Sequence, residues 1–189
     1  MKRLDIYLRD VRFAKAKPFV RQDDVVLDIG CEDGALFESL RGVIKRGIGV
    51  DPVLAQKLET SLYTLYPGMF PQAVPDGEKC DVITMLAVLE HIPPAEQARL
   101  GQRCHDFLNP AGRVVITVPS PRVDQILHVL RALHLVQAET LHEHYGFKID
   151  ETAHLFTRPL FRVLHTRKFQ LGLNNLFVFE RLQIDCGSG

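Results

Sequence analysis

The feature that most constrains this fold is an apolar stretch running into two closely spaced glycines, residues 25–36. Its first five residues, VVLDI, are apolar except for Asp28, as expected of a parallel strand buried on both faces. Gly30 and Gly34 follow where the backbone must bend and where a Cβ would block a ligand. A helix beginning near residue 35 would direct its N-terminal amides at this turn. The stretch therefore predicts a strand, a tight turn and a helix beside a small ligand with a negative or hydrogen-bond-accepting end.

A second short apolar segment, residues 47–50, also ends in an acid, Asp51. Asp51 follows Asp28 by about the length of one β-α-β step, roughly 20 residues, which is the spacing of a ribose-binding carboxylate. A carboxylate there can accept hydrogen bonds from both ribose hydroxyls. We therefore expect a nucleoside-containing cofactor at the carboxyl ends of parallel strands.

Four segments in this order resemble the class I S-adenosylmethionine-dependent methyltransferases. They are the glycine turn at 28–34, the acid at Asp51, the run CDVITMLAVLEHI at 80–92, and NPAGRV at 109–114. The run at 80–92 is similar to the fourth strand and Leu-Glu-His signature of the type 11-like, small-molecule branch. The resemblance covers roughly residues 20–120 in register. It implies S-adenosylmethionine as cofactor, methyl transfer to a small molecule, and a Rossmann-like α/β fold with a doubly wound, mostly parallel seven-stranded sheet and an antiparallel C-terminal hairpin.

The resemblance also implies a set of cofactor-binding residues. Asp51, with Pro52 beside it, would hold the ribose, and Asp28 would order the glycine turn. Gly30, Cys31 and Gly34 would let the backbone approach the amino acid end of the cofactor. Gln72 would accept a hydrogen bond from the adenine, and Met85 and Leu86 would line the sulfonium end.

Glu32 departs from the family pattern, which has glycine at this position. Its side chain brings bulk and negative charge to the turn nearest the amino acid end of the cofactor. It could pair with the cofactor's ammonium group, or it could exclude the cofactor and leave a catalytically degenerate binding or scaffold protein. A nicotinamide-dependent oxidoreductase is a third interpretation, but its Gly-x-Gly-x-x-Gly pattern would need glycine at position 32.

Methyl transfer from a sulfonium needs no obligatory nucleophile or metal, because the cofactor carries the activation. His91, just past the fourth strand, is the nearest candidate base, with a structural role as the alternative. His144 and Tyr145 lie in a region where family members often cover the substrate, and both can donate and accept hydrogen bonds. His142 and His144 form a His-x-His pair, but no third ligand is evident, so we expect no metal site.

The rest of the chain alternates strands with helices, which predicts a parallel sheet. We expect one domain over 1–189, with an N-terminal helical extension at 1–22 and a substrate-covering insertion at 119–149. The N-terminal helix reads as a solvated helix packed on the domain, with a lid or a contact to an acidic partner as the alternative. Periodicity and turn signals predict helices at 3–15, 35–40, 54–65, 93–108, 123–135 and 150–156, and strands at 25–29, 47–50, 69–74, 81–86, 113–118, 161–171 and 176–182.

Composition narrows the class of protein. Hydrophobic residues make up 46% and charged residues 24% of the 189 residues, and the formal net charge is zero. A nucleic-acid-binding protein would carry a basic stripe, and a membrane span would need about 20 consecutive apolar residues. The four cysteines form no Cys-x-x-Cys pair, which favours reduced thiols. We expect a cytoplasmic monomer or homodimer that acts on a small molecule, not on nucleic acid or a membrane.

Overall fold

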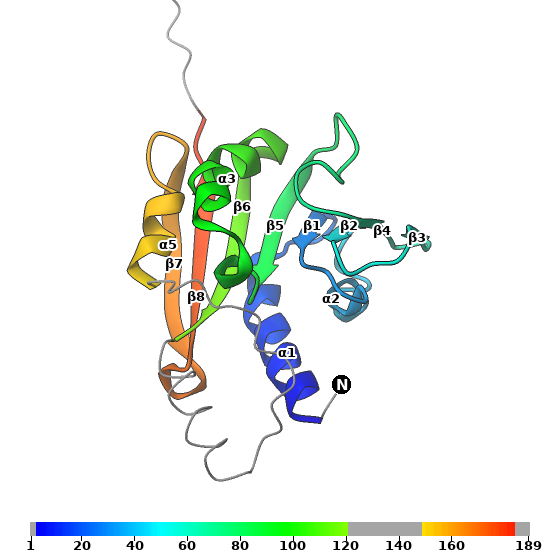
Figure 1. Cartoon of the computed structure of the whole chain (residues 1–189), viewed down its shortest axis with the longest axis horizontal. Helices are drawn as coiled ribbons and strands as arrows, with labels where there is room; N and C mark the ends of the chain where they lie inside the picture. The colour runs from blue at the N-terminus through cyan, green and yellow to red at the C-terminus, as the bar shows by residue number, and fades with distance from the viewer. Residues whose placement is uncertain (1–2, 121–148, 184–189) are drawn as a thin grey trace, which may run out of the picture.

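The computed structural model describes residues 3–120 and 149–183, and within these ranges the chain forms one eight-stranded sheet. The strand order is β3-β4-β2-β1-β5-β6-β8-β7 (Figure 1). The strands are β1 (Val25–Ile29), β2 (Arg46–Asp51), β3 (Leu58–Glu59), β4 (Tyr63–Pro67), β5 (Cys80–Leu86), β6 (Leu108–Pro119), β7 (Phe161–Phe169) and β8 (Asn174–Arg181).

Five neighbouring strands, β4, β2, β1, β5 and β6, run parallel. Strand β8 is antiparallel to both β6 and β7, and β3 is antiparallel to β4. The predicted doubly wound sheet with a C-terminal hairpin is therefore confirmed. The eighth strand, β3, is a two-residue addition that the sequence did not predict.

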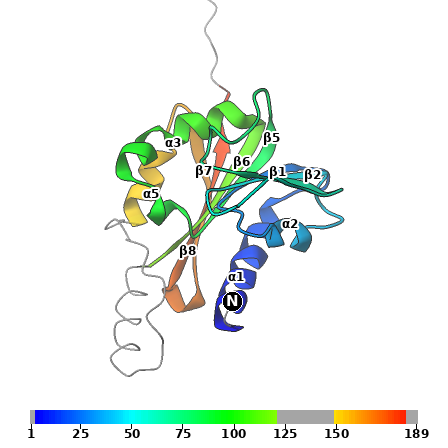
Figure 2. The ribbon, with the colours of Figure 1, turned by 45° about the vertical axis from the view of Figure 1, so that its right-hand side comes forward.

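Helices cover both faces of the sheet. They are α1 (Arg3–Ala16), α2 (Ala35–Ser39), α3 (Pro94–Phe107) and α5 (Ile149–Leu155), with the 3₁₀ turns η1 (Lys17–Phe19), η2 (Leu89–His91) and η3 (Gln170–Gly172). Figure 2 shows α1 and α2 on one face and α3 and α5 on the other. One apolar core lies under each helical layer, because alternate strand residues point to opposite faces.

The helix predicted over 54–65 is wrong. Tyr63 and Leu65 are buried residues of β4, which pairs with β2, while Leu58 is 46% exposed on β3. The leucine spacing mimicked a helical stripe, but β2 ends at Asp51 and β4 begins at Tyr63. That interval is too short for a helix with its two connecting turns.

The strand predicted over 69–74 is wrong for a related reason. The third long strand lies earlier, in β4, and residues 69–74 form a turn in which the Ala73 amide donates to the Met69 carbonyl at 2.9 Å. Phe70 and Val74 of this turn pack into the core on the α3 side, and the Phe70 ring lies 5.2 Å from that of Phe107. The turn thus covers sheet surface that a crossover helix would otherwise cover.

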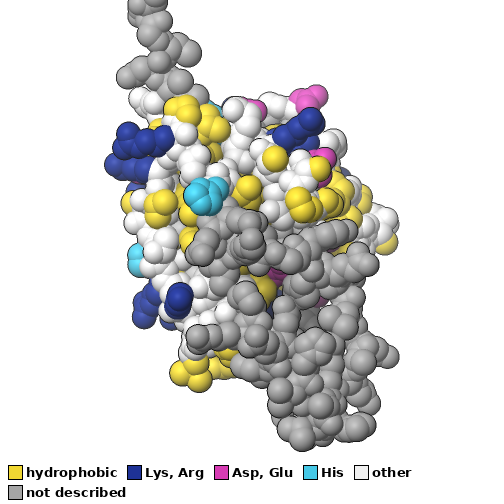
Figure 3. Space-filling view, turned by 60° about the vertical axis from the view of Figure 1, so that its left-hand side comes forward, with side chains coloured by type: hydrophobic (Ala, Val, Ile, Leu, Met, Phe, Trp, Pro, Cys, Tyr) yellow, Lys and Arg dark blue, Asp and Glu magenta, His cyan; other side chains and the backbone are white. Residues whose placement is uncertain are grey.

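Strand β7 forms the far edge of the sheet and carries charge. Arg162, Arg167 and Lys168 are exposed, and the register shifts between Val163 and His165 where β7 pairs with β8. Figure 3 looks from this side and shows Lys and Arg side chains toward the left-hand margin, with hydrophobic side chains scattered between them. Charges and an irregular register discourage further strand pairing at an edge.

The remaining elements lie close to their predicted ranges. Helices α1, α2, α3 and α5 overlap the predictions at 3–15, 35–40, 93–108 and 150–156. The helix predicted at 123–135 and almost all of the 119–149 insertion lie outside the described residues. Among the described residues, no helix combines the length and apolar character needed to cross a bilayer.

Candidate cofactor site

The turn after β1 is held against the end of β2. The Gly30 amide donates to the Val50 carbonyl at 2.9 Å, and the Gly34 amide donates to the Cys31 carbonyl at 2.8 Å. Gly30 and Gly34 have φ of +80° and +78°, a conformation that glycine adopts without strain. A Cβ on Gly30 would collide with the Val88 side chain, and one on Gly34 would lie 2.9 Å from the Tyr63 ring. Both glycines are therefore required by the packing of neighbouring side chains as well as by the bend.

Glu32 adopts a glycine-like backbone conformation, with φ of +48°, and its side chain is exposed. Its amide donates to Asp51 Oδ2 at 2.9 Å, while the Val53 amide donates to Oδ1 at 3.0 Å. Each oxygen of the Asp51 carboxylate therefore accepts one backbone bond and keeps further acceptor capacity. The arrangement holds the β2 acid directly beside the glycine turn.

Asp28 is 4% exposed on β1 and accepts a hydrogen bond from Thr84 Oγ1 of β5 at 2.6 Å. Burial, opposed by this hydrogen bond and reinforced by the charge of Asp51, raises the pKa of Asp28 to about 7. Burial and the same two acids also raise the pKa of the Cys31 thiol, which keeps it protonated and unreactive. A cation placed beside Asp28 would favour its ionised form.

Asp33 links the turn to two helices. Its Oδ1 accepts from the Ala35 amide at the start of α2 at 3.0 Å, and its Oδ2 lies 3.5 Å from Arg9 Nη1 of α1. The Arg9 guanidinium also lies 5.5 Å from the centre of the Phe13 ring. The N-terminal helix is therefore part of the surroundings of the glycine turn.

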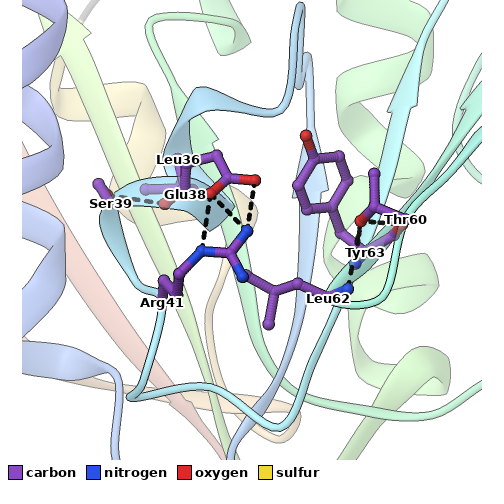
Figure 4. A network of polar contacts seen from close by, with 7 residues as sticks. All are labelled: Leu36, Glu38, Ser39, Arg41, Thr60, Leu62 and Tyr63. Atoms are coloured by element: carbon purple, nitrogen blue, oxygen red, sulfur yellow. Dashed lines mark hydrogen bonds and ion pairs between the residues drawn. The ribbon is translucent and has the colours of Figure 1, made fainter.

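The Tyr63 ring that fills the space beside Gly34 is itself supported. It stacks on Phe37 of α2 with ring centres 5.2 Å apart, and the Tyr63 amide donates to Thr60 Oγ1 at 3.0 Å. Figure 4 shows Tyr63 facing α2, where Glu38 forms a bidentate pair with Arg41. The stacking of Tyr63 on Phe37 ties β4 to α2.

Sequence comparison then decides the family. Residues 5–166 match the model of a family described as "Methyltransferase domain", which is most of the chain. The chain belongs to the methyltransferase-domain family. Its sheet order and its glycine turn facing the β2 acid are those of a class I S-adenosylmethionine-dependent methyltransferase, and S-adenosylmethionine is the cofactor of that class.

The curated relatives match this chain over part of their length. A ubiquinone biosynthesis O-methyltransferase of Pseudomonas putida strain W619 is 36% identical over 98 residues, which are 47% of this chain and 41% of that protein. A carboxy-S-adenosyl-L-methionine synthase of Psychrobacter is 27% identical over 107 residues, 49% of this chain and 39% of its own. The chain thus spans about two fifths of the length of these relatives.

Solved structures share the fold over most of the chain. The N-methyltransferase NodS of Bradyrhizobium japonicum, in complex with S-adenosyl-L-homocysteine, has a TM-score of 0.65 at 16% identity and covers 93% of this chain and 88% of its own. Magnesium protoporphyrin IX methyltransferase of Synechocystis, with the same ligand bound, has a TM-score of 0.62 at 17% identity, covering 93% and 82%. At these identities the likeness concerns the fold.

The other predicted site residues are spread around the turn. Pro52 and Gln72 are exposed on the loops after β2 and β4. Met85 is fully buried in the core on the α3 side, while Leu86 is half-buried on the opposite face. His91 is exposed at the end of η2.

The loop that carries His91 is held by a residue of α3. Gln97 Nε2 donates to the carbonyls of Leu89 and Ile92, at 3.1 and 2.7 Å. His144 and Tyr145 lie outside the described residues. Within those residues, no three His, Cys, Asp or Glu side chains are grouped to hold a metal ion.

Two residues of the turn's surroundings escaped the sequence analysis. Thr84 lies inside the recognised 80–92 run, and strand alternation places it on the same face of the sheet as Asp28, so a paired register could have found it. Arg9 lies 24 positions before Asp33. It belongs to the N-terminal helix, which the sequence predicted to be solvated, and no sequence signal links Arg9 to Asp33.

Proposed function

We propose that this chain transfers a methyl group from S-adenosylmethionine to a small molecule. The observation that carries the proposal is the junction of Glu32 and Asp51, in which the turn amide donates to the β2 carboxylate at 2.9 Å. Despite its side chain, Glu32 keeps a left-handed backbone and leaves the carboxylate beside the turn. A ribose needs just such a carboxylate.

The residues around the turn have separate roles in this proposal. Asp51 accepts the two ribose hydroxyls through its remaining lone pairs, with Pro52 beside it. Gly30, Cys31 and Gly34 present backbone to the amino acid end. Glu32 supplies negative charge toward the ammonium group, and Asp28 orders the glycine turn.

The other end of the proposed site lies over two loops anchored to Asp51. The amide of Gly68, the residue before Met69, donates to the Asp51 carbonyl at 3.1 Å. The Val53 amide donates to the Asp51 carboxylate. Val53 and Met69 are 76% and 55% exposed. Exposed apolar side chains beside a ribose acid suit the faces of an adenine ring, and Gln72, in the same turn as Met69, can accept from the adenine amino group.

At the acceptor end of the site, the role proposed for the protein is to align the acceptor with the methyl group. The bound sulfonium supplies the activated methyl group, and the protein aligns the acceptor and excludes water. Leu86 and Met85, at the end of β5, are proposed to line this end. His91 remains the candidate base for an acceptor that loses a proton, with His144 and Tyr145 as further candidates.

A degenerate cofactor-binding or scaffold protein is the alternative, because Glu32 adds a carboxylate where the family has glycine. Calorimetric titration of Glu32→Gly with S-adenosylhomocysteine separates the two. A large gain in affinity supports a degenerate site, whereas a loss shows that the carboxylate contributes to binding. The wild-type titration tests the proposal itself: folded protein that gives no heat at millimolar ligand contradicts it.

We also propose that the protein acts in the cytoplasm. The support is that Cys31, Cys80 and Cys104 are free buried thiols, a pattern typical of a reducing compartment. Whether the chain is a monomer or a homodimer remains a prediction that size-exclusion chromatography with light scattering would test.

A further inference from the structure

A diagonal row of buried polar side chains crosses the α1 face of the sheet near the carboxyl ends of its parallel strands. The row runs from Asp28 on β1 through Thr84 on β5 and Thr117 on β6 to Asn174 on β8, and all four residues are at most 5% exposed. Each lies two positions from a member of the apolar core on this face, so strand alternation turns all four to the same side. These neighbours are Val26, Val82, Val115 and Leu176.

The two halves of the row differ in their hydrogen bonds. Asp28 and Thr84 satisfy one another. In the other half, within residues 3–120 and 149–183, three buried atoms lack a hydrogen-bond partner: Thr117 Oγ1, Asn174 Oδ1 and Gln170 Nε2. Asn174 Nδ2 donates to Gln170 Oε1, so these two side chains are in contact. Buried polar groups are nearly always paired, and a cluster that is not calls for a water or a ligand.

The β-ladder fixes where this cluster lies. Thr117 pairs with Leu86, at the end of β5, and Asn174 pairs with Pro119 on the same strand as Thr117. Neighbouring strands are about 4.8 Å apart, so the cluster lies roughly 5–10 Å from the end of β5. In the proposed function the sulfonium end of the cofactor is at the end of β5.

The backbone at the same corner is strained. Gln170 and Leu171 have φ of +50° and +56°, and Leu171 is 99% exposed at the tip of η3. Because Leu171 is exposed, its side chain makes no packing contacts that would offset the cost of its left-handed backbone. Strain of this kind concentrates at functional sites, and here it sets the position of Gln170.

We propose that Thr117, Gln170 and Asn174 form the subsite that holds the methyl acceptor, and that they recognise an uncharged group which both donates and accepts hydrogen bonds. The inference rests on the proposed function, because it takes the end of β5 as the place of methyl transfer. A primary amide would satisfy two of the three atoms, because its N–H groups can donate to Asn174 Oδ1 and its carbonyl can accept from Gln170 Nε2. The Thr117 hydroxyl can donate or accept. None of the three side chains is ionisable, so an anionic group bound by them alone would be buried without a counter-charge.

The strand spacing also limits the acceptor's size. The reacting atom and the uncharged polar group should be separated by roughly 5–10 Å, from one to two strand spacings. A benzene ring with para substituents has this span. The three atoms are shielded from solvent, and α1 contacts β5 and β6 on this face, so the acceptor enters by displacing α1.

The test uses two rings that differ in charge, 4-hydroxybenzamide and 4-hydroxybenzoate, titrated by saturation-transfer NMR in the presence of S-adenosylhomocysteine. We expect the neutral amide to bind at least about ten-fold more tightly than the anion, because only the amide satisfies both free groups without burying a charge. Equal binding, tighter binding of the benzoate, or binding of neither ring overturns the proposal.

Variants then locate the binding. Thr117→Val and Asn174→Leu should each weaken 4-hydroxybenzamide binding about five-fold or more, with S-adenosylhomocysteine binding unchanged. Thr152→Val is the matched control, since Thr152 Oγ1 is also buried without a partner but lies on α5, on the other face. If Thr117→Val and Asn174→Leu fold, bind the amide as the wild type does and are only more stable, the cluster holds water alone and the proposal is wrong. Failure of the wild type to bind S-adenosylhomocysteine would instead count against the proposed function.

Discussion

The buried carboxyl of Asp28 should make this protein less stable as pH rises from about 4 to 7. Burial raises the pKa of Asp28 from 3.8 to about 7 in the folded chain. Between these values the folded chain holds a proton that the unfolded chain has released, so the free energy of unfolding falls with rising pH. The full effect above pH 7 is about 4 kcal/mol, since each pKa unit corresponds to about 1.4 kcal/mol.

Asp28→Asn isolates this effect because it removes the titration and keeps an oxygen that can accept from Thr84. The new amide N–H groups add a cost that does not change with pH, so we compare the variant with the wild type at two pH values. We subtract the unfolding free energy of the wild type from that of the variant at each pH. This difference should be about 3 kcal/mol more positive at pH 8 than at pH 5.

Urea unfolding followed by circular dichroism at pH 5, 6, 7 and 8 measures this difference. Asp23→Asn is the matched control, because Asp23 is exposed in the turn before β1 and its Oδ1 accepts from another exposed side chain, Gln22, at 3.4 Å. The reasoning is refuted if Asp28→Asn and the wild type keep a constant difference, within about 0.5 kcal/mol, over the whole range.

Three further substitutions test the packing around the site and the N-terminal segment by the same unfolding assay. Glu32→Gly should change the unfolding free energy by less than about 1 kcal/mol, because relief of the left-handed φ opposes the entropy that glycine adds to the unfolded chain; a loss above 2 kcal/mol would show that the side chain has a structural role. Gly49→Ala should cost about 1–3 kcal/mol, since its Cβ would lie 2.5 Å from Leu65 Cδ2, and an unchanged stability would contradict that packing. Arg113→Ala should lower the unfolding free energy by about 3 kcal/mol or more, because it removes the ion-pair partner of the Asp24 carboxylate. Asp24 is 8% exposed and lies 3.4 Å from the Arg113 guanidinium. A loss below about 1 kcal/mol would mean that water replaces the guanidinium.

The sequence predicted the parts of the site that lie within one β-α-β unit. Asp51 ends β2, and Asp28 is the next-to-last residue of the adjacent parallel strand β1. The structure pairs Asp28 with Gly49, two residues before Asp51. Local chemistry was enough here, because a strand, a glycine turn and a second strand fix their own geometry. The same reasoning failed at 54–65, where leucine spacing suggested a helix and strand pairing with β2 decided the outcome instead.

The long-range contacts could not be predicted from one sequence. The pair of Arg9 and Asp33 depends on how α1 crosses the sheet. The cluster of Thr117, Gln170 and Asn174 depends on strand order, because β8 lies between β6 and β7 and reverses direction. Each of these residues is unremarkable in its own segment and gains its place from the register of the assembled sheet.

The most direct measurement of the central claim is the affinity of Asp51→Ala for S-adenosylhomocysteine, measured by calorimetry beside the wild type. The account predicts saturable one-to-one binding to the wild type and a loss of about one hundred-fold in the variant, because two hydrogen bonds to a charged carboxylate disappear. Folded Asp51→Ala that binds the ligand as tightly as the wild type would contradict the placement of the ribose, and with it the site described above.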